Sequence, residues 1–323
     1  MRKIGIVGAG AWGTALAIIA QRAQHQVTVW SREKAVVMAI DGQHENTLFL
    51  PGIELPSGIR ATNDLHAMLE QEILLLVVPA QYVRATCERL SSIGLDTSMP
   101  LIICSKGIEC RSSKLMSEVV EEAIPNLMAV LTGPTFAAEV AKGLPASATL
   151  ACKDPKLGKW LAQAVAHPRF RIYHSSDVVS SQICGAVKNV IAIACGIIEG
   201  MELGESARAA LIFSGLAEIS QLCIAKGGNR ETVMEPCGVG DLMLTCSSRT
   251  SRNMSLGYAL GQGKTLEQIM KKRRSVVEGV TCADAVRTLA AQLGIRLPIC
   301  EVVDRIVRGN ADIEEMVSTL VGE

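Results

Sequence analysis

A lysine and an asparagine interrupt an otherwise apolar stretch in the second half of the chain. Lys188 and Asn189 stand inside CGAVKNVIAIACGI (184–197), whose pattern predicts a buried helix. Burying an ammonium group is costly unless a neighbouring group compensates its charge. Three of the residues about one helical turn away are small: Cys184, Gly185 and Ala192. This face leaves room for a ligand or a close neighbour, so we expect Lys188 to do chemistry; a structural lysine would instead extend its ammonium to the surface.

A second polar cluster follows a glycine turn in GVGDLMLTCSSRTSRN (238–253). Arginine and amide groups suit a phosphate, and the acid and hydroxyls suit a hydroxylated ligand. We therefore expect this stretch to bind an anionic, hydroxylated molecule. The alternative is a surface loop with a helix cap at Ser251. The candidate ligand-binding residues are Asp241, Thr245, Ser251, Arg252 and Asn253.

A glycine motif near the N-terminus, GAGAWG (8–13), follows an apolar strand and opens a helix. In that context Gly8 permits a tight turn, Gly10 lets the backbone approach a pyrophosphate, and Gly13 lets helix and strand pack closely. The N–H groups and dipole at the start of the helix favour phosphate. The motif predicts a dinucleotide site.

The end of the second predicted strand bears on which dinucleotide binds. NAD sites usually carry an acid here, whereas this strand ends Trp30-Ser31-Arg32. Arg32 can grip a 2′-phosphate, and Glu33 is expected to face the following helix. The sequence thus favours NADP(H), with NAD(H) as the alternative; in the latter case Arg32 is a solvated surface residue.

Short apolar runs in the first half of the chain alternate with helical stretches. The runs lie at 3–8, 26–30, 72–79, 100–107, 128–134, 146–152 and 170–174. This alternation indicates an α/β fold with a mostly parallel, doubly wound, Rossmann-like sheet. From about residue 176 helical patterns dominate. We expect a dinucleotide-binding domain at 1–178 and an all-α substrate-binding and catalytic domain at 179–323.

Three strand ends in the first half carry chemical groups, and ligands bind beyond the carboxyl ends of such strands. The ends read VVPA (77–80), CSKGIE (104–109) and LTGPTFAAEV (131–140). Lys106 is then expected to project toward the nicotinamide end of the site. Gly133 and Thr135 offer backbone and hydroxyl groups to the same space. A lysine just after a strand can also be an ordinary solvated loop residue.

The overall composition excludes several function classes. Lys plus Arg and Asp plus Glu each number 32, which argues against a general nucleic-acid binder. Eleven cysteines without a Cys-x-x-Cys pair and five scattered histidines predict no metal site. The first 20 residues resemble a signal peptide, but four glycines argue against it. With no long uncharged run elsewhere, we expect a soluble cytoplasmic protein without a membrane span.

Taken together, the motifs closely resemble the NAD(P)-dependent glycerol-3-phosphate dehydrogenases of the bacterial, biosynthetic type. The resemblance runs over nearly the whole chain, in blocks that keep the family's order. Besides the three stretches quoted first, these blocks are LPGI (50–53), SKGIE (105–109), GPTFAAEV (133–140) and VEG (277–279). Several blocks in the right order are more specific than any one of them.

The resemblance implies a reaction, a set of roles and a homodimer. The reaction reduces dihydroxyacetone phosphate to sn-glycerol 3-phosphate, reversibly, for glycerophospholipid synthesis. Lys188 matches the family's proton acceptor and, with Lys106 and Asp241, forms the implied catalytic set. Implied substrate contacts are Lys106, Gly133, Thr135, Lys188, Asp241, Ser251, Arg252 and Asn253. The residue pattern itself adds Thr245 and also Asn189, which either bonds substrate or only orients its helical turn. Implied cofactor contacts are Trp12, Arg32, Ala137, Arg252, Val276 and Glu278, and the motif and strand-end arguments above add Gly8, Gly10, Gly13 and Lys106.

Two departures and two alternatives accompany this resemblance. Ala11 and Thr135 stand where many relatives carry serine, and Thr135 keeps the hydroxyl. A nucleotide sensor without turnover would have lost Lys188 or Asp241, and both are present. A hydroxyacid or sugar-acid dehydrogenase would need a carboxylate site instead of a phosphate site, and 238–253 favours phosphate only through the resemblance.

Overall fold

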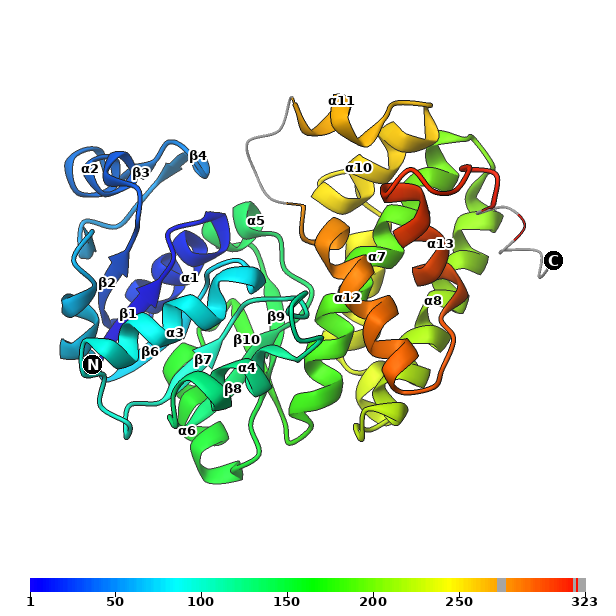
Figure 1. Cartoon of the computed structure of the whole chain (residues 1–323). Helices are drawn as coiled ribbons and strands as arrows, with labels where there is room; N and C mark the ends of the chain where they lie inside the picture. The colour runs from blue at the N-terminus through cyan, green and yellow to red at the C-terminus, as the bar shows by residue number, and fades with distance from the viewer. Residues whose placement is uncertain (272–276, 316–317, 319–323) are drawn as a thin grey trace. The chain divides into compact units, whose positions relative to one another are not determined.

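The computed structural model describes residues 1–271, 277–315 and 318. Contacts between residues divide the chain into two compact units (Figure 1). The first unit comprises Met1–Ser105 and Met116–Val178, and the second comprises Lys106–Leu115 and Val179–Glu323. The segment Lys106–Leu115 thus belongs with the helices, although it lies within the stretch assigned to the dinucleotide-binding domain.

The first unit is built on a sheet in the order β5-β2-β1-β6-β7-β8-β9-β10. Its strands are β1 (Lys3–Val7), β2 (Gln26–Trp30), β5 (Ile59–Thr62), β6 (Ile73–Leu76), β7 (Leu101–Ile103), β8 (Met128–Thr132), β9 (Ala146–Ala151) and β10 (Phe170–Ser175). The six strands β5, β2, β1, β6, β7 and β8 are parallel to one another. Strand β9 is antiparallel to β8 and parallel to β10. The strand order reverses beside β1, so the residues that follow β1 lie where such sheets bind ligands.

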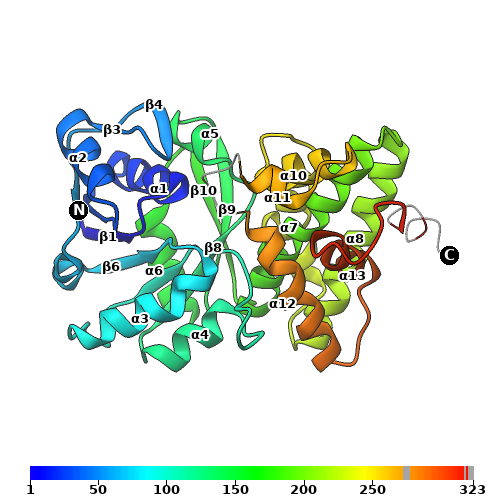
Figure 2. The same cartoon turned by 45° about the horizontal axis from the view of Figure 1, so that its top comes forward.

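Helices cover both faces of this sheet (Figure 2). One face carries α1 (Ala11–Arg22), α5 (Ala137–Ala141) and α6 (Pro155–Val165); the other carries α3 (Val83–Ser92) and α4 (Met116–Ala123). Along β6, Ile73 and Leu75 pack into the first layer, and Leu74 and Leu76 into the second. Burial on both sides explains why the strand is apolar at every position.

The predicted doubly wound sheet is confirmed, although several small elements escaped prediction. The sequence patterns missed β5 and the antiparallel pair β3 (Glu45–Asn46) and β4 (Leu50–Glu54), which follow α2 (Lys34–Gln43). These strands are short, and β4 contains Pro51 and Gly52, which are rare in strands. Helix α4 begins only at Met116, because Ile108 and Leu115 form an antiparallel bridge before it.

The second unit is helical, as predicted, and is organised around α7 (Val178–Gly200). The residues of α7 from Ile183 to Ile198 are buried. The helices packed with it are α8 (Glu205–Ala225), α9 (Asp241–Cys246), α10 (Arg252–Gly261), α11 (Leu266–Met270), α12 (Glu278–Gln292) and α13 (Pro298–Val307). Ile108 and Leu115 join this apolar core and so fix Lys106 to the helical unit.

Helices α7 and α10 approach each other at backbone contact. A Cβ atom on Gly257 would lie 1.9 Å from the Ile193 carbonyl oxygen, and one on Gly196 would lie 2.2 Å from that of Met254. Only glycine fits at such a crossing. The close approach brings the start of α10, with Arg252 and Asn253, beside the helix that carries Lys188.

Within the described part of the chain, two helices, α7 and α8, are long and apolar enough to cross a membrane by length and composition. The apolar window of α7 is 89% buried inside the protein, as expected for the core helix of a folded domain, and that of α8 is 33% buried. Core helices of soluble proteins pass the same test, so this is weak evidence for membrane insertion.

Candidate active site

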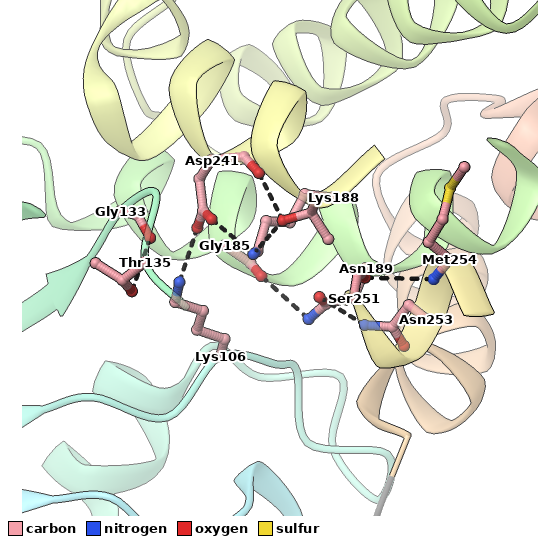
Figure 3. A network of polar contacts seen from close by, with 11 residues as sticks. Lys106, Gly133, Thr135, Gly185, Lys188, Asn189, Asp241, Ser251, Asn253 and Met254 are labelled. Atoms are coloured by element: carbon pink, nitrogen blue, oxygen red, sulfur yellow. Dashed lines mark hydrogen bonds and ion pairs between the residues drawn. The ribbon is translucent and has the colours of Figure 1, made fainter. Parts of the chain in front are cut away.

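Two lysines share one buried carboxylate in the second unit (Figure 3). Lys188 Nζ donates to Asp241 Oδ1 at 2.7 Å, and Lys106 Nζ donates to Asp241 Oδ2 at 2.8 Å. Lys188 also donates to Thr245 Oγ1 at 2.7 Å, and this hydroxyl donates to the Asp241 carbonyl at 2.6 Å. The groups that compensate the charge of Lys188 therefore come from α9.

Helix α9 presents Asp241 and Thr245 on one face because they are four residues apart. Asp241 is the first residue of the helix, where the helix dipole favours a negative charge. One π-helical turn, Pro236–Gly240, leads directly into it. A Cβ atom on Gly238 would lie 2.1 Å from the Val233 carbonyl oxygen, so this turn packs tightly against the short 3-10 helix Glu231–Met234 that precedes it.

The environment of Lys188 lowers the pKa of its ammonium toward neutral pH. Burial lowers the pKa of its ammonium from 10.5 to about 8. The Asp241 carboxylate raises this pKa, and the Lys106 ammonium lowers it. Burial therefore outweighs the carboxylate, a balance that the sequence left open. A lysine with a pKa near 8 can both donate and accept a proton under physiological conditions.

An amide network connects α7, α10 and α12 beside the lysines. Asn253 Nδ2 donates to Asn189 Oδ1 at 2.9 Å, and Asn253 Oδ1 accepts from the Gly279 N–H at 3.0 Å. Asn189 Nδ2 donates to the Gly185 carbonyl in its own helix at 3.3 Å. Asn189 thus orients Asn253. Ser251 Oγ accepts from the Met254 N–H, so the helix cap considered for Ser251 is present.

The glycine turn in the first unit has the form that a dinucleotide needs. Gly8 has φ of 120°, and a Cβ atom on Gly13 would lie 1.9 Å from the Gly8 carbonyl oxygen. A Cβ atom on Gly10 would meet nothing within 4 Å, so space remains in front of the turn. Helix α1 has no side-chain cap at Gly10, and the buried Trp12 Nε1 has no partner among the described residues. These groups fit a phosphate-bearing cofactor.

At the end of β2, Arg32 is largely exposed and pairs with its neighbour Glu33 at 3.1 Å. The Glu33 carboxylate also accepts from Ser31 Oγ at 3.1 Å. Glu33 therefore turns back toward the strand end, and the expectation that it faces the next helix is wrong. The carboxylate can do so because Glu33 precedes the first residue of α2 and is not held by the helix.

The remaining candidate residues fall in both units. In the first, Thr135 Oγ1 donates to the Gly133 carbonyl at 3.3 Å beyond β8 (Figure 3), and Ala137 is the first residue of α5. In the second, Arg252 and Glu278 are the first residues of α10 and α12. Val276 lies outside the described residues.

Comparisons with known proteins agree with this architecture. Residues 3–158 match the model of the NAD-dependent glycerol-3-phosphate dehydrogenase N-terminus, and residues 177–318 match that of its C-terminus. The chain belongs to the NAD-dependent glycerol-3-phosphate dehydrogenase family. The family resemblance seen in the sequence is thereby confirmed.

Individual members of the glycerol-3-phosphate dehydrogenase family are similar over their full length. Proteins named glycerol-3-phosphate dehydrogenase [NAD(P)+] from Parvibaculum lavamentivorans and Caulobacter vibrioides are 51% and 49% identical, over 99% of this chain and 96% of each relative. The crystal structure of a glycerol-3-phosphate dehydrogenase from Coxiella burnetii superposes with a TM-score of 0.95 at 36% identity, covering 100% of this chain and 99% of that one.

Sequence reasoning missed one polar residue in the first unit. Asn46 is fully buried, and its amide donates to the carbonyl of Ala9 inside the glycine turn at 2.8 Å. It stands four residues before the LPGI block, to which no role was assigned. No sequence signal marked it, because its neighbours His44, Glu45 and Thr47 are polar as well and the stretch has the composition of a loop.

Proposed function

We propose that this chain catalyses the NAD(P)-dependent interconversion of dihydroxyacetone phosphate and sn-glycerol 3-phosphate, and that it supplies the latter for glycerophospholipid synthesis. The observation that carries the proposal is the buried ammonium of Lys188, held by Asp241 and Thr245 in a helical unit of this family. The names of the curated relatives support the choice of substrate and cofactor.

In the proposed mechanism Lys188 handles the proton. The nicotinamide, when bound, supplies the hydride chemistry. Reducing a ketone builds negative charge on its oxygen, which the Lys188 ammonium stabilises before donating its proton. In the oxidative direction the neutral amine takes the proton back. Asp241 and Thr245 hold Nζ in place through bonds of 2.7 Å, and Lys106 adds positive charge on the other carboxylate oxygen.

We place the substrate phosphate at the start of α10. Arg252 is the first residue of this helix and Ser251 its cap, so a guanidinium and a helix dipole act together on an anion. Asn253 is held by Asn189 and Gly279, which fixes this end of the helix. Gly133 and Thr135 complete the proposed substrate contacts, and Trp12, Ala137 and Glu278 are proposed cofactor contacts.

A direct assay tests the proposed reaction. The purified protein is mixed with NADPH or NADH and dihydroxyacetone phosphate, and the absorbance of the reduced nicotinamide is followed. Oxidation that depends on the phosphorylated ketone is expected. Absence of oxidation with both cofactors would overturn the proposal. Oxidation with a 2-keto acid of similar size and not with dihydroxyacetone phosphate would favour a hydroxyacid dehydrogenase.

We propose that NADP(H) is preferred over NAD(H). The exposed guanidinium of Arg32 stands at the end of β2, where a 2′-phosphate would bind. Glu33 opposes this preference, because its carboxylate lies at the same strand end and could accept from ribose hydroxyls. The ratio of kcat/KM for NADPH and NADH decides between the two cofactors.

We also propose that the chain is a cytoplasmic homodimer that uses the outer face of α8. From Ser206 to Ala225 every exposed residue of this helix is uncharged. Phe213 and Ile224 are 75% and 56% exposed, respectively. An isologous interface would cover such a face with its own copy. A cytoplasmic location agrees with the eleven free cysteines, which stay reduced there.

Molar mass in solution tests the dimer. Light scattering after gel filtration should give twice the chain mass, and Phe213→Glu with Ile224→Glu should give the monomer. A monomeric wild-type protein would overturn the proposal. So would a dimer that the double substitution leaves intact.

A further inference from the structure

The buried amide of Asn46 connects three backbone segments of the first unit. Nδ2 donates to the Ala9 carbonyl and to Thr14 Oγ1, both at 2.8 Å. Oδ1 accepts from the Phe49 N–H at 3.1 Å. Because the Phe49 N–H group can only donate, it must face Oδ1 of Asn46, and Nδ2 therefore faces the glycine turn. Both amide hydrogens of Asn46 are therefore spent on the turn and the helix that follows it.

These bonds determine where the N–H groups of the turn point. In a trans peptide the carbonyl and the following N–H point in opposite directions, and no described peptide is cis. Fixing the Ala9 carbonyl on Asn46 therefore aims the Gly10 N–H away from Asn46. Thr14 Oγ1 donates to the Gly10 carbonyl at 3.0 Å, which fixes the next peptide in the same way.

We propose that Asn46 is a positioning residue for the dinucleotide pyrophosphate. It holds the Ala9 and Gly10 peptides in the orientation that presents the N–H groups of Gly10 and Ala11 to phosphate oxygens, in the open space in front of Gly10. The inference rests on the proposed use of NAD(P)(H). It adds a polar contact behind the turn, on a side chain that never touches the cofactor.

The first unit offers a matched control for a merely structural asparagine. Asn126 is 6% exposed and also donates two bonds to backbone carbonyls, those of Asp96 and Met99 at 2.7 and 2.9 Å. It lies just before β8, and its partners precede β7, at the amino ends of these strands. Ligands of such sheets bind at the opposite, carboxyl ends. Removing Asn126 should therefore cost stability without affecting the cofactor.

The experiment compares Asn46→Asp with Asn126→Asp by fluorescence titration of NADPH and NADH, with melting temperature as a second readout. Aspartate keeps the acceptor for Phe49 and removes both donated bonds. We expect Asn46→Asp to weaken both cofactors by the same factor, about tenfold or more, because the pyrophosphate is common to them. In turnover the loss should appear in the KM for the cofactor more than in kcat. Asn126→Asp should lower the melting temperature and leave both dissociation constants within about twofold.

Several outcomes would overturn the inference. Unchanged cofactor affinity in Asn46→Asp, or an equal loss in Asn126→Asp, would reduce Asn46 to a structural role. If Asn46→Asp does not fold, Thr14→Val removes one of the two contacts and should weaken both cofactors severalfold; an unchanged affinity there contradicts the proposal. A wild-type protein that binds neither cofactor refutes the proposed function itself, which is a separate result.

Discussion

The glycine turn of the first unit and the lysine cluster of the second both offer hydrogen-bond donors to a ligand, but the donors differ in charge. The turn presents neutral backbone N–H groups, held from behind by the uncharged side chains of Asn46 and Thr14. The cluster presents two ammonium groups on one buried carboxylate, Asp241. The turn is contiguous in sequence, whereas Asp241 lies 53 and 135 residues from its two lysine partners.

The difference separates two ways of binding anions. The turn depends on peptide orientation, so its affinity for an anion should not vary with pH near neutrality. The cluster depends on charge balance in a dry site, so its function should follow the protonation of Lys188. Substitutions of Lys188 or Asp241 should accordingly damage the chemistry and spare cofactor binding, and substitutions around the turn should do the reverse.

The largest effect is expected from Lys188→Met, which keeps much of the volume and removes the proton donor. Turnover should fall by about 10³-fold or more, since both proton transfer and charge stabilisation are lost. NADPH affinity, measured by fluorescence titration, should stay within about twofold. Lys264→Met, at an exposed lysine of the same unit, serves as the control and should behave like wild type. Normal turnover in Lys188→Met would refute the assigned role.

Asp241→Asn should have the next largest effect, because two ammonium groups then face an uncharged amide. Removing one partner of a buried ion pair costs about 3–5 kcal/mol, measurable by chemical denaturation. Without the carboxylate that raises it, the pKa of Lys188 should fall further, and reduction at pH 7 should slow. Asp304→Asn removes another buried acid, paired with Arg287 and Arg308, and should cost stability without moving the pH profile.

The pH dependence of the wild-type enzyme tests the charge balance itself. Reduction needs protonated Lys188, so its kcat/KM should be level below pH 8 and fall about tenfold per unit above it. Oxidation needs the neutral amine, so its kcat/KM should rise to about pH 8 and then level off. Profiles that change in the same direction for both reactions would contradict a single group acting as acid and base.

The sequence predicted the layers of the fold because those layers follow from local patterns. Apolar runs such as β6 are short, whereas the apolar stretch of α7 continues over 23 residues, so length separates the strand from the helix. The reversed direction of β9 left no such mark, since an apolar strand reads the same whichever way it runs. The assignment of Lys106–Leu115 to the helical unit depends on where Ile108 and Leu115 pack, which is a tertiary property.

The site shows the same limit. The positions of Lys188 and Asp241 stood out because charged residues interrupt apolar or glycine-rich stretches. Their pairing through the two oxygens of one carboxylate, and the shared amide network of Asn189 and Asn253, arise only when helices from distant parts of the chain meet. Asn46 was invisible for a related reason: its partner is a backbone carbonyl, which carries no sequence signal.

The smallest expected effect concerns Arg32, which lies next to the turn and acts by charge. Arg32→Ser should raise the KM for NADPH about tenfold and leave the KM for NADH nearly unchanged, because only NADPH carries the 2′-phosphate. Arg171→Ser, at an exposed arginine that stacks on Tyr173 in the same unit, should leave both values unchanged. An equal loss for the two cofactors would place Arg32 with the pyrophosphate contacts of the turn. No loss for either cofactor would mean that the Glu33 pair already satisfies this guanidinium and that the preference for NADP(H) has another origin.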